Sequence, residues 1–144
     1  YEKEKIQTLY LGGGTPSCLS KEDLEKLHRI VETFDLTEDC EFTFECNIED
    51  ICEDLLKKLK SMHVNRLSIG IESFDKCKLE FMNRQANCKD VKEKIELARL
   101  YGFDNINLDL MYGIPGERMK NLKKDLDLEN TSDKIKFLKH FLKY

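Results

Sequence analysis

The residues best suited to chemistry form a glycine-rich turn that follows an apolar run. Residues 9–17 read LYLGGGTPS, so a β-patterned segment ends at three glycines and continues through a threonine and a proline. Glycine has no Cβ and lets the backbone approach a ligand closely, while proline fixes the direction in which the chain leaves. An ordinary strand-to-helix turn, the alternative interpretation, needs one glycine rather than three. We therefore expect backbone amides and carbonyls here to face a ligand bound beyond the strand.

Three acidic residues are expected close to this turn, because each lies at or near the end of a later β-patterned run. They are Glu45, Glu72 and Asp109. Three carboxylates at one mouth would raise one another's pKa, and a cationic ligand or the nearby Arg84 would relieve this repulsion. A divalent metal held by the three acids is the main chemical alternative. The pattern therefore predicts a shared site with an excess of negative charge.

Secondary structure must position these residues, and the chain alternates short β-patterned runs with helical ones. This order predicts parallel strands joined by crossover helices. We expect Ser20 to cap the first helix, Asn47 to cap the second and Gly102 to end the third. A last helical stretch is expected to break near residues 130–132. The expected strands are residues 6–11, 41–45, 66–72 and 105–111, and the best-defined helix covers about residues 88–101.

The expected strands alternate apolar and polar residues. Parallel strands that are buried on both faces normally read as continuous apolar runs, so this alternation predicts helices on one face only. A polar inner face on a parallel sheet is typical of a barrel, or part of one, that holds a polar ligand at the carboxyl ends of its strands. The alternative is a sheet with one solvated face. In the third strand Leu67, Ile69 and Ile71 oppose Arg66, Ser68, Gly70 and Glu72.

Length and composition favour a single α/β domain in the cytoplasm. The chain has 144 residues, of which 40% are hydrophobic and 36% charged, and its formal net charge of −4 argues against a nucleic-acid surface. We find no signal peptide and no apolar run of about 18 residues, so we expect no membrane span. The six cysteines form no C-x-x-C pair, which excludes a self-contained zinc or iron–sulfur motif and favours reduced thiols.

Five short motifs occur in a recognisable order. They read LGGGTPS at 11–17, TFECN at 43–47, NRLSIGIESF at 65–74, NR at 83–84 and NLDLMYGIPG at 107–116. Together they resemble the radical S-adenosylmethionine enzymes of the oxygen-independent coproporphyrinogen III oxidase family, including its haem-chaperone relatives. The match covers about residues 6–118.

The resemblance implies part of a (β/α)₆ barrel, a partial TIM barrel, that binds S-adenosylmethionine and carries a [4Fe–4S] cluster. It implies a porphyrin or haem as the partner of the whole protein. The family's C-x₃-C-x₂-C cluster motif lies before Ile6 and is not among these residues. We therefore expect a fragment, or a degenerate copy, that is inactive alone. Residues 1–118 would form the barrel core of four βα units, and residues 119–144 a divergent helical tail.

The same resemblance assigns roles in cofactor binding. Backbone carbonyls of the glycine turn and the carboxylate of Glu45 suit the ammonium group of the methionine end. Arg84 suits a carboxylate or ribose oxygens, although a surface ion pair is its alternative interpretation. Asp109 suits ribose hydroxyls, and Glu72 stands where the family usually has glutamine, which removes donors and adds a charge. The implied cofactor-binding residues are Gly13, Gly14, Thr15, Glu45, Glu72, Arg84 and Asp109.

Two other functions stay open from the residues. The chain could be a non-catalytic remnant or ligand-binding α/β module, and its exposed first-strand edge would then invite association with another chain. It could instead be a metal- or phosphate-dependent α/β enzyme, with the glycine turn as an anion-binding nest. The absence of G-x-x-x-x-G-K-[ST] argues against hydrolysis of nucleoside triphosphates.

Overall fold

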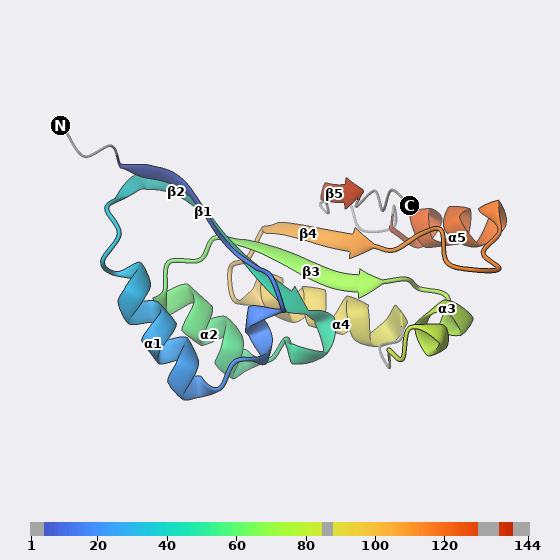
Figure 1. Cartoon of the computed structure of the whole chain (residues 1–144), viewed down its shortest axis with the longest axis horizontal. Helices are drawn as coiled ribbons and strands as arrows, with labels where there is room; N and C mark the ends of the chain where they lie inside the picture. Colours follow the sequence, from blue (N-terminus) through green and yellow to red (C-terminus); the bar gives the residue numbers. More distant parts are fainter. Residues whose placement is uncertain (1–4, 85–87, 130–135, 140–144) are drawn as a thin grey trace.

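A computed structural model describes residues 5–84, 88–129 and 136–139 of the chain. Its centre is a parallel sheet of five strands in the order β1-β2-β3-β4-β5, which is also their order in the sequence (Figure 1). The strands are β1 (Ile6–Leu11), β2 (Leu36–Asn47), β3 (Arg66–Glu72), β4 (Asn105–Leu110) and β5 (Lys136–Lys139). The helices are α1 (Lys21–Val31), α2 (Glu53–Ser61), α3 (Lys76–Phe81), α4 (Cys88–Leu100) and α5 (Met119–Glu129), with 3₁₀ turns at Pro16–Cys18 and Ile48–Asp50.

The sheet confirms the predicted α/β class with parallel βα units. Helices α1, α2 and α4 lie together on one face of the strands (Figure 1). Most apolar side chains of the strands are buried in the core on that face, and Phe44, Leu67 and Ile106 are at most 1% exposed. Covering one face with helices buries the apolar half of each alternating strand and leaves the polar half on the opposite face.

Polar side chains in the middle of the opposite face are nonetheless buried. Thr43, Ser68 and Asn107 are each 2% exposed. They are not left without partners, because Arg66 donates to the Thr43 hydroxyl at 3.0 Å and Asn107 donates to the Ser68 hydroxyl at 3.2 Å. A buried polar group costs free energy unless it is hydrogen-bonded, so this layer is a built feature of the sheet.

Two of the three helix ends predicted from the sequence are confirmed, and one is wrong. Ser20 caps α1 and accepts a hydrogen bond from the Asp23 amide at 3.1 Å, and Gly102 follows α4 with φ of +80°. The prediction that Asn47 caps the next helix is wrong. A 3₁₀ turn, Ile48–Asp50, separates Asn47 from α2, whose N-cap is Cys52. The Asn47 side chain is instead free to take part in contacts at the end of β2.

The second strand is longer than the predicted residues 41–45. It begins at Leu36, because Ile6 of β1 pairs with that residue, and after an irregularity in register residues 8–11 pair with residues 41–44. Pairing with a neighbour extends a strand through residues whose own pattern is weak. Strand β1 forms an edge of the sheet. In the described part of the chain it pairs with β2 alone, which leaves its other side open as expected.

The chain after residue 118 is not purely helical. Helix α5 is followed by β5, which pairs in parallel with β4 from Asn107↔Lys136 to Leu110↔Lys139. Four residues are too short for a periodic pattern, so this strand could not be predicted from the sequence. The expected break near residues 130–132 lies outside the described residues. The division of the chain at residue 118 stays a prediction.

Buried charges join α5 to the rest of the domain. The ammonium group of Lys78 donates to Asp125 at 2.8 Å, to Glu117 at 2.5 Å and to the Met111 carbonyl at 3.1 Å. The side chains of Lys78, Glu117 and Asp125 are 7%, 8% and 1% exposed. Burial opposes the charged form of Lys78, but these partners outweigh it and raise the pKa of the lysine. The described helices include none long and apolar enough to cross a membrane.

Candidate functional site

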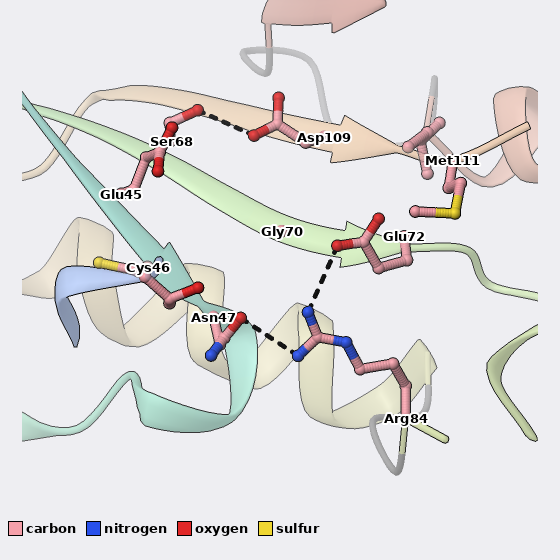
Figure 2. Close-up of a pocket in the computed structure, with 11 residues that line it drawn as sticks. Glu45, Cys46, Asn47, Ser68, Gly70, Glu72, Arg84, Asp109 and Met111 are labelled. Atoms are coloured by element: carbon pink, nitrogen blue, oxygen red, sulfur yellow. Dashed lines mark hydrogen bonds and ion pairs between the residues drawn. The ribbon is translucent and has the colours of Figure 1, made fainter. Parts of the chain in front are cut away.

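A cavity of about 280 Å³ opens where β2, β3 and β4 end. The glycine turn after β1 contributes Thr15 to its lining, and the segment after α3 contributes Arg84. Figure 2 shows Glu45 and Asn47 on β2, Glu72 on β3 and Asp109 on β4 around this space. Of the seven residues predicted from the sequence, five line the cavity: Thr15, Glu45, Glu72, Arg84 and Asp109.

Gly13 and Gly14 belong to the same turn, although neither is among the lining residues. Both adopt the left-handed region, with φ of +81° and +80°, which glycine populates without a steric cost. Gly13 reaches the site through its amide, which donates to Oε2 of Glu45 at 2.9 Å. Thr15 also has a positive φ of +59°, which an L-residue adopts at a cost. The turn therefore holds a fixed, unusual backbone shape beside the cavity.

Glu45 is held by two donors from the first strand and its turn. Its Oε1 accepts from the Tyr10 hydroxyl at 2.5 Å, and its Oε2 accepts from Gly13. A Cβ added to Gly12 would lie 2.5 Å from Cδ of Glu45 and 2.6 Å from Cε1 of Tyr10. A side chain at Gly12 would therefore displace the Glu45 carboxylate or the Tyr10 ring from its present position. No role for Tyr10 and no distinct role for Gly12 could be predicted from the sequence, although the run of three glycines was the available signal.

Asp109 is held in place by hydrogen bonds from the buried polar side chains of the sheet. The Ser68 hydroxyl donates to its Oδ2 at 3.0 Å, and the Asn107 amide donates to its Oδ1 at 2.8 Å. Figure 2 shows Ser68 and Asp109 reaching toward one another from neighbouring strands. The alternation in β3 predicts the position of Ser68 on the polar face, but no sequence pattern assigned a role to Ser68 or Asn107. Ser68 and Asn107 each donate to one oxygen of Asp109, and these two hydrogen bonds hold its carboxylate in its orientation toward the cavity.

Glu72 and Arg84 meet across the cavity. Arg84 donates to Oε1 of Glu72 at 3.4 Å and to Oδ1 of Asn47 at 3.1 Å (Figure 2). The Arg84 side chain is 30% exposed and that of Glu72 is 18% exposed. The arginine thus joins the ends of β2 and β3 through a partly exposed ion pair. Its role in binding a ligand stays a prediction.

Charge in the site is unbalanced. Glu45, Glu72 and Asp109 line the cavity together with a single arginine. Burial raises the pKa of Glu72, and the Arg84 guanidinium opposes this rise. Burial and the hydrogen bond to Glu45 raise the pKa of Tyr10 to about 12, so its hydroxyl stays a donor at neutral pH. A cavity with surplus carboxylates favours a ligand that carries positive charge.

The arrangement does not suit a metal or a cluster. The parts of the chain that the structure describes contain no group of three His, Cys, Asp or Glu side chains that could hold a metal ion. The strand-end acids instead bind donors of the protein itself. Cys18, Cys40, Cys46, Cys52 and Cys77 are free thiols. Nor does the glycine turn fit an anion, because its Gly13 amide already faces the Glu45 carboxylate.

Comparison with known proteins defines the class of this domain. The family model described as the Radical SAM superfamily matches residues 1–128, and the chain belongs to this superfamily. A solved structure, coproporphyrinogen III oxidase (HemN) from Escherichia coli, described as a radical SAM enzyme, superposes with a TM-score of 0.81 at 28% identity. That match covers 92% of this chain and 31% of the other. An archaeal Elp3 from Methanocaldococcus infernus, at a TM-score of 0.70 and 19% identity, shares the fold.

Curated proteins similar to the chain include two named as haem chaperones. HemW of Bacillus subtilis (strain 168) is 42% identical over 133 residues, which are 89% of this chain and 34% of the relative. HemW of Lactococcus lactis is 39% identical over 128 residues, 88% of this chain and 34% of the relative. The chain thus spans about a third of the length of these relatives. The family resemblance and the partial-barrel fold predicted from the sequence are confirmed.

Proposed function

We propose that the cavity binds S-adenosylmethionine and that the chain is the cofactor-binding core of a radical S-adenosylmethionine protein of porphyrin or haem metabolism. The observation that carries the proposal is the convergence of three carboxylates and one guanidinium beside the glycine turn. The ligand has a sulfonium and an ammonium group, a carboxylate and two ribose hydroxyls. The cavity offers acceptors for the cations and the hydroxyls, and a donor for the carboxylate.

Each residue has a role that follows from its present contacts. Glu45 keeps lone pairs beyond those used by Tyr10 and Gly13, so it can accept a further bond from the ammonium group. Asp109, oriented by Ser68, would accept from ribose hydroxyls. Arg84 would donate to the carboxylate. Thr15 and the backbone of the glycine turn would complete the pocket around the methionine end.

The chemistry belongs to the bound groups rather than to these side chains. When a [4Fe–4S] cluster and S-adenosylmethionine are both bound, the pair supplies one-electron chemistry. The described residues suit S-adenosylmethionine, but they contain no donor set for the [4Fe–4S] cluster. This chain's own residues would therefore bind and orient the cofactor. We propose that they do so in a reducing cytoplasm, which the free thiols of the described cysteines support.

The relatives favour a role in porphyrin or haem handling for the whole protein. They include proteins named as haem chaperones and one named as an oxygen-independent coproporphyrinogen-III oxidase-like protein. Two activities of the whole protein are then possible alternatives: oxidative decarboxylation of a porphyrinogen, or transfer of haem. Assays of the parent protein with coproporphyrinogen III and with haemin would decide between them.

A second candidate is a cofactor-binding module without radical chemistry of its own. It is favoured by the lack of a cluster donor set among the described residues. Anaerobic reconstitution of the parent protein with iron and sulfide separates the candidates, because neither of them predicts a cluster on the 144-residue chain alone. A parent protein that binds S-adenosylmethionine but retains no stoichiometric iron supports the module, whereas retained iron and a cluster absorption spectrum would contradict it.

Calorimetric titration tests the binding itself. We expect the chain to bind S-adenosylmethionine and the Glu45→Gln variant to bind it at least ~10-fold more weakly, because the cation loses a charged acceptor. Glu80→Gln is a matched control, since Glu80 lies on α3 with its side chain 63% exposed and pairs with Lys76. Absence of binding by the folded wild type at millimolar ligand would refute the proposal. Binding of Mg²⁺ or inorganic phosphate instead, lost on Asp109→Asn, would revive the metal- or phosphate-dependent alternative.

A further inference from the structure

We infer that Glu72 sets the selectivity of the cavity for carboxylate-bearing ligands, because it occupies Arg84 with a negative charge of the protein's own. The inference rests on the proposed binding of S-adenosylmethionine and deepens it, since it concerns the amino-acid end of the ligand. The ligand class is a zwitterion in which a carboxylate lies next to a cationic centre. Glu72 acts on these ligands by competing for the guanidinium of Arg84, and not by contacting the cationic centre of the ligand.

The guanidinium of Arg84 is already engaged on two sides. One nitrogen donates to Asn47 at 3.1 Å and lies 3.6 Å from Oε2 of Glu49, while the other donates to Glu72 at 3.4 Å. A ligand carboxylate that binds this guanidinium must therefore share it with two carboxylates of the chain. Glu72 is the more enclosed of the two, at 18% exposure against 36% for Glu49. Its charge is accordingly the less screened by water.

The backbone holds Glu72 in this position. Glu72 has a φ of +63°, which non-glycine residues seldom adopt, and the pairing of β3 with β4 shifts register between Gly70 and Glu72. The Glu72 carbonyl also accepts from the Met111 amide at 2.7 Å. Such an irregularity at a strand end re-aims a side chain. The contact with Arg84 is thus fixed by the strand end and is not a chance encounter of two flexible side chains.

The charges that face Glu72 come from three other segments. They are Arg84 after α3, Asp109 on β4 and Glu49 in the 3₁₀ turn after β2. With Glu72 ionised, the carboxylates around Arg84 exceed its single positive charge, so an incoming carboxylate meets repulsion. Protonation of Glu72 removes that repulsion and frees a donor of Arg84. Burial raises the pKa of Glu72, which brings this protonation closer to neutral pH.

A pair of ligands that differ in the carboxylate tests the inference. The 144-residue chain is titrated with S-adenosylmethionine and with its decarboxylated analogue, which keeps the sulfonium and the amine, between pH 5 and 7. We expect the affinity ratio, S-adenosylmethionine over analogue, to rise as pH falls. Glu72→Gln should raise the ratio about tenfold at pH 7 and abolish its pH dependence, because one nearby charge is removed. Glu80→Gln, an exposed acid on α3, should leave the ratio unchanged.

The outcomes separate this inference from the proposed function. If the wild type binds both ligands and Glu72→Gln changes both affinities by the same factor, Glu72 acts on the cation and the inference is wrong. If the folded wild type binds neither ligand, the proposed function fails and the inference fails with it. Circular dichroism checks that the variant folds. The pH dependence of the wild-type ratio tests the inference without any substitution, and a ratio that is flat from pH 5 to 7 would overturn it.

Discussion

A Cβ atom on Gly12 would lie 2.5 Å from the carboxylate carbon of Glu45. The glycine directly follows β1 and the acid lies on the neighbouring strand β2, and the space left by the missing side chain is the space that the carboxylate fills. At the first position of the turn, glycine leaves room for a side chain of β2. At the next two positions, glycine suits the backbone because φ is positive. One run of three identical residues thus meets two different physical requirements.

Gly12→Ala should weaken binding of S-adenosylmethionine at least ~10-fold, because the new methyl group displaces Glu45 from Gly13 and Tyr10. Titration calorimetry measures the affinity, and thermal unfolding checks that the fold persists. Gly116→Asn, outside the glycine turn, is the control, since asparagine tolerates the left-handed region and no described atom lies within 4 Å of a Cβ there. Equal losses for the two variants would show that the effect of Gly12→Ala does not depend on its relation to Glu45.

Tyr10→Phe should change how stability depends on alkaline pH. The folded-state pKa of Tyr10 is raised to about 12, so the protonated hydroxyl stabilises the fold below the unfolded value of about 10. That contribution is lost as pH rises from about 10 to about 12. The free energy of unfolding, from urea titrations at several pH values, should therefore fall more steeply in the wild type than in the variant. Parallel curves for the two proteins would contradict the contact with Glu45.

Glu72→Gln should stabilise the fold at neutral pH. Burial raises the folded-state pKa of this carboxyl, so its ionisation costs stability as pH rises above the unfolded value of about 4.3. The gain from the variant should be present at pH 7 and disappear toward pH 3, below both pKa values, where the group is neutral in both states. Urea titrations at the two pH values measure it. A loss of stability at pH 7 would mean that the pair with Arg84 outweighs the burial of Glu72.

Lys78→Met should destabilise the fold by about 3–5 kcal/mol, because it leaves the buried carboxylates of Asp125 and Glu117 without their cation. The exposed Lys76→Met, whose side chain is 89% exposed in the wild type, should change stability by less than about 0.5 kcal/mol. Urea denaturation measures both. A small effect of Lys78→Met would indicate that α5 does not pack on α3 as described.

The open edge of β1 should make the chain associate at high concentration, since its backbone donors and acceptors on that side lack a strand partner among the described residues. Light scattering after size exclusion should show a mass that rises with concentration. Thr8→Lys, a charge at an exposed position of this strand, should reduce the rise. A mass equal to that of the monomer at every concentration would rule out association through this edge.

The sequence by itself determined the order of the first four strands and of the helices α1, α2 and α4 between them, and the end of each strand at which the site lies. Alternation of apolar and polar residues reveals which face packs on helices, because burial follows the two-residue period of a strand. The family motifs added the ligand class. The sequence could also place Glu45, Glu72 and Asp109 at one mouth, since parallel strands end on the same edge of a sheet.

Contacts between distant residues were decided only by the tertiary structure. Asn47 pairs with Arg84 rather than capping a helix, Gly12 makes room for Glu45, and Lys78 meets an acid on α5. These relations depend on the register between strands and on the exact path of turns, which local sequence patterns do not specify. The short β5 belongs here too, because four residues become a strand when β4 offers them a partner.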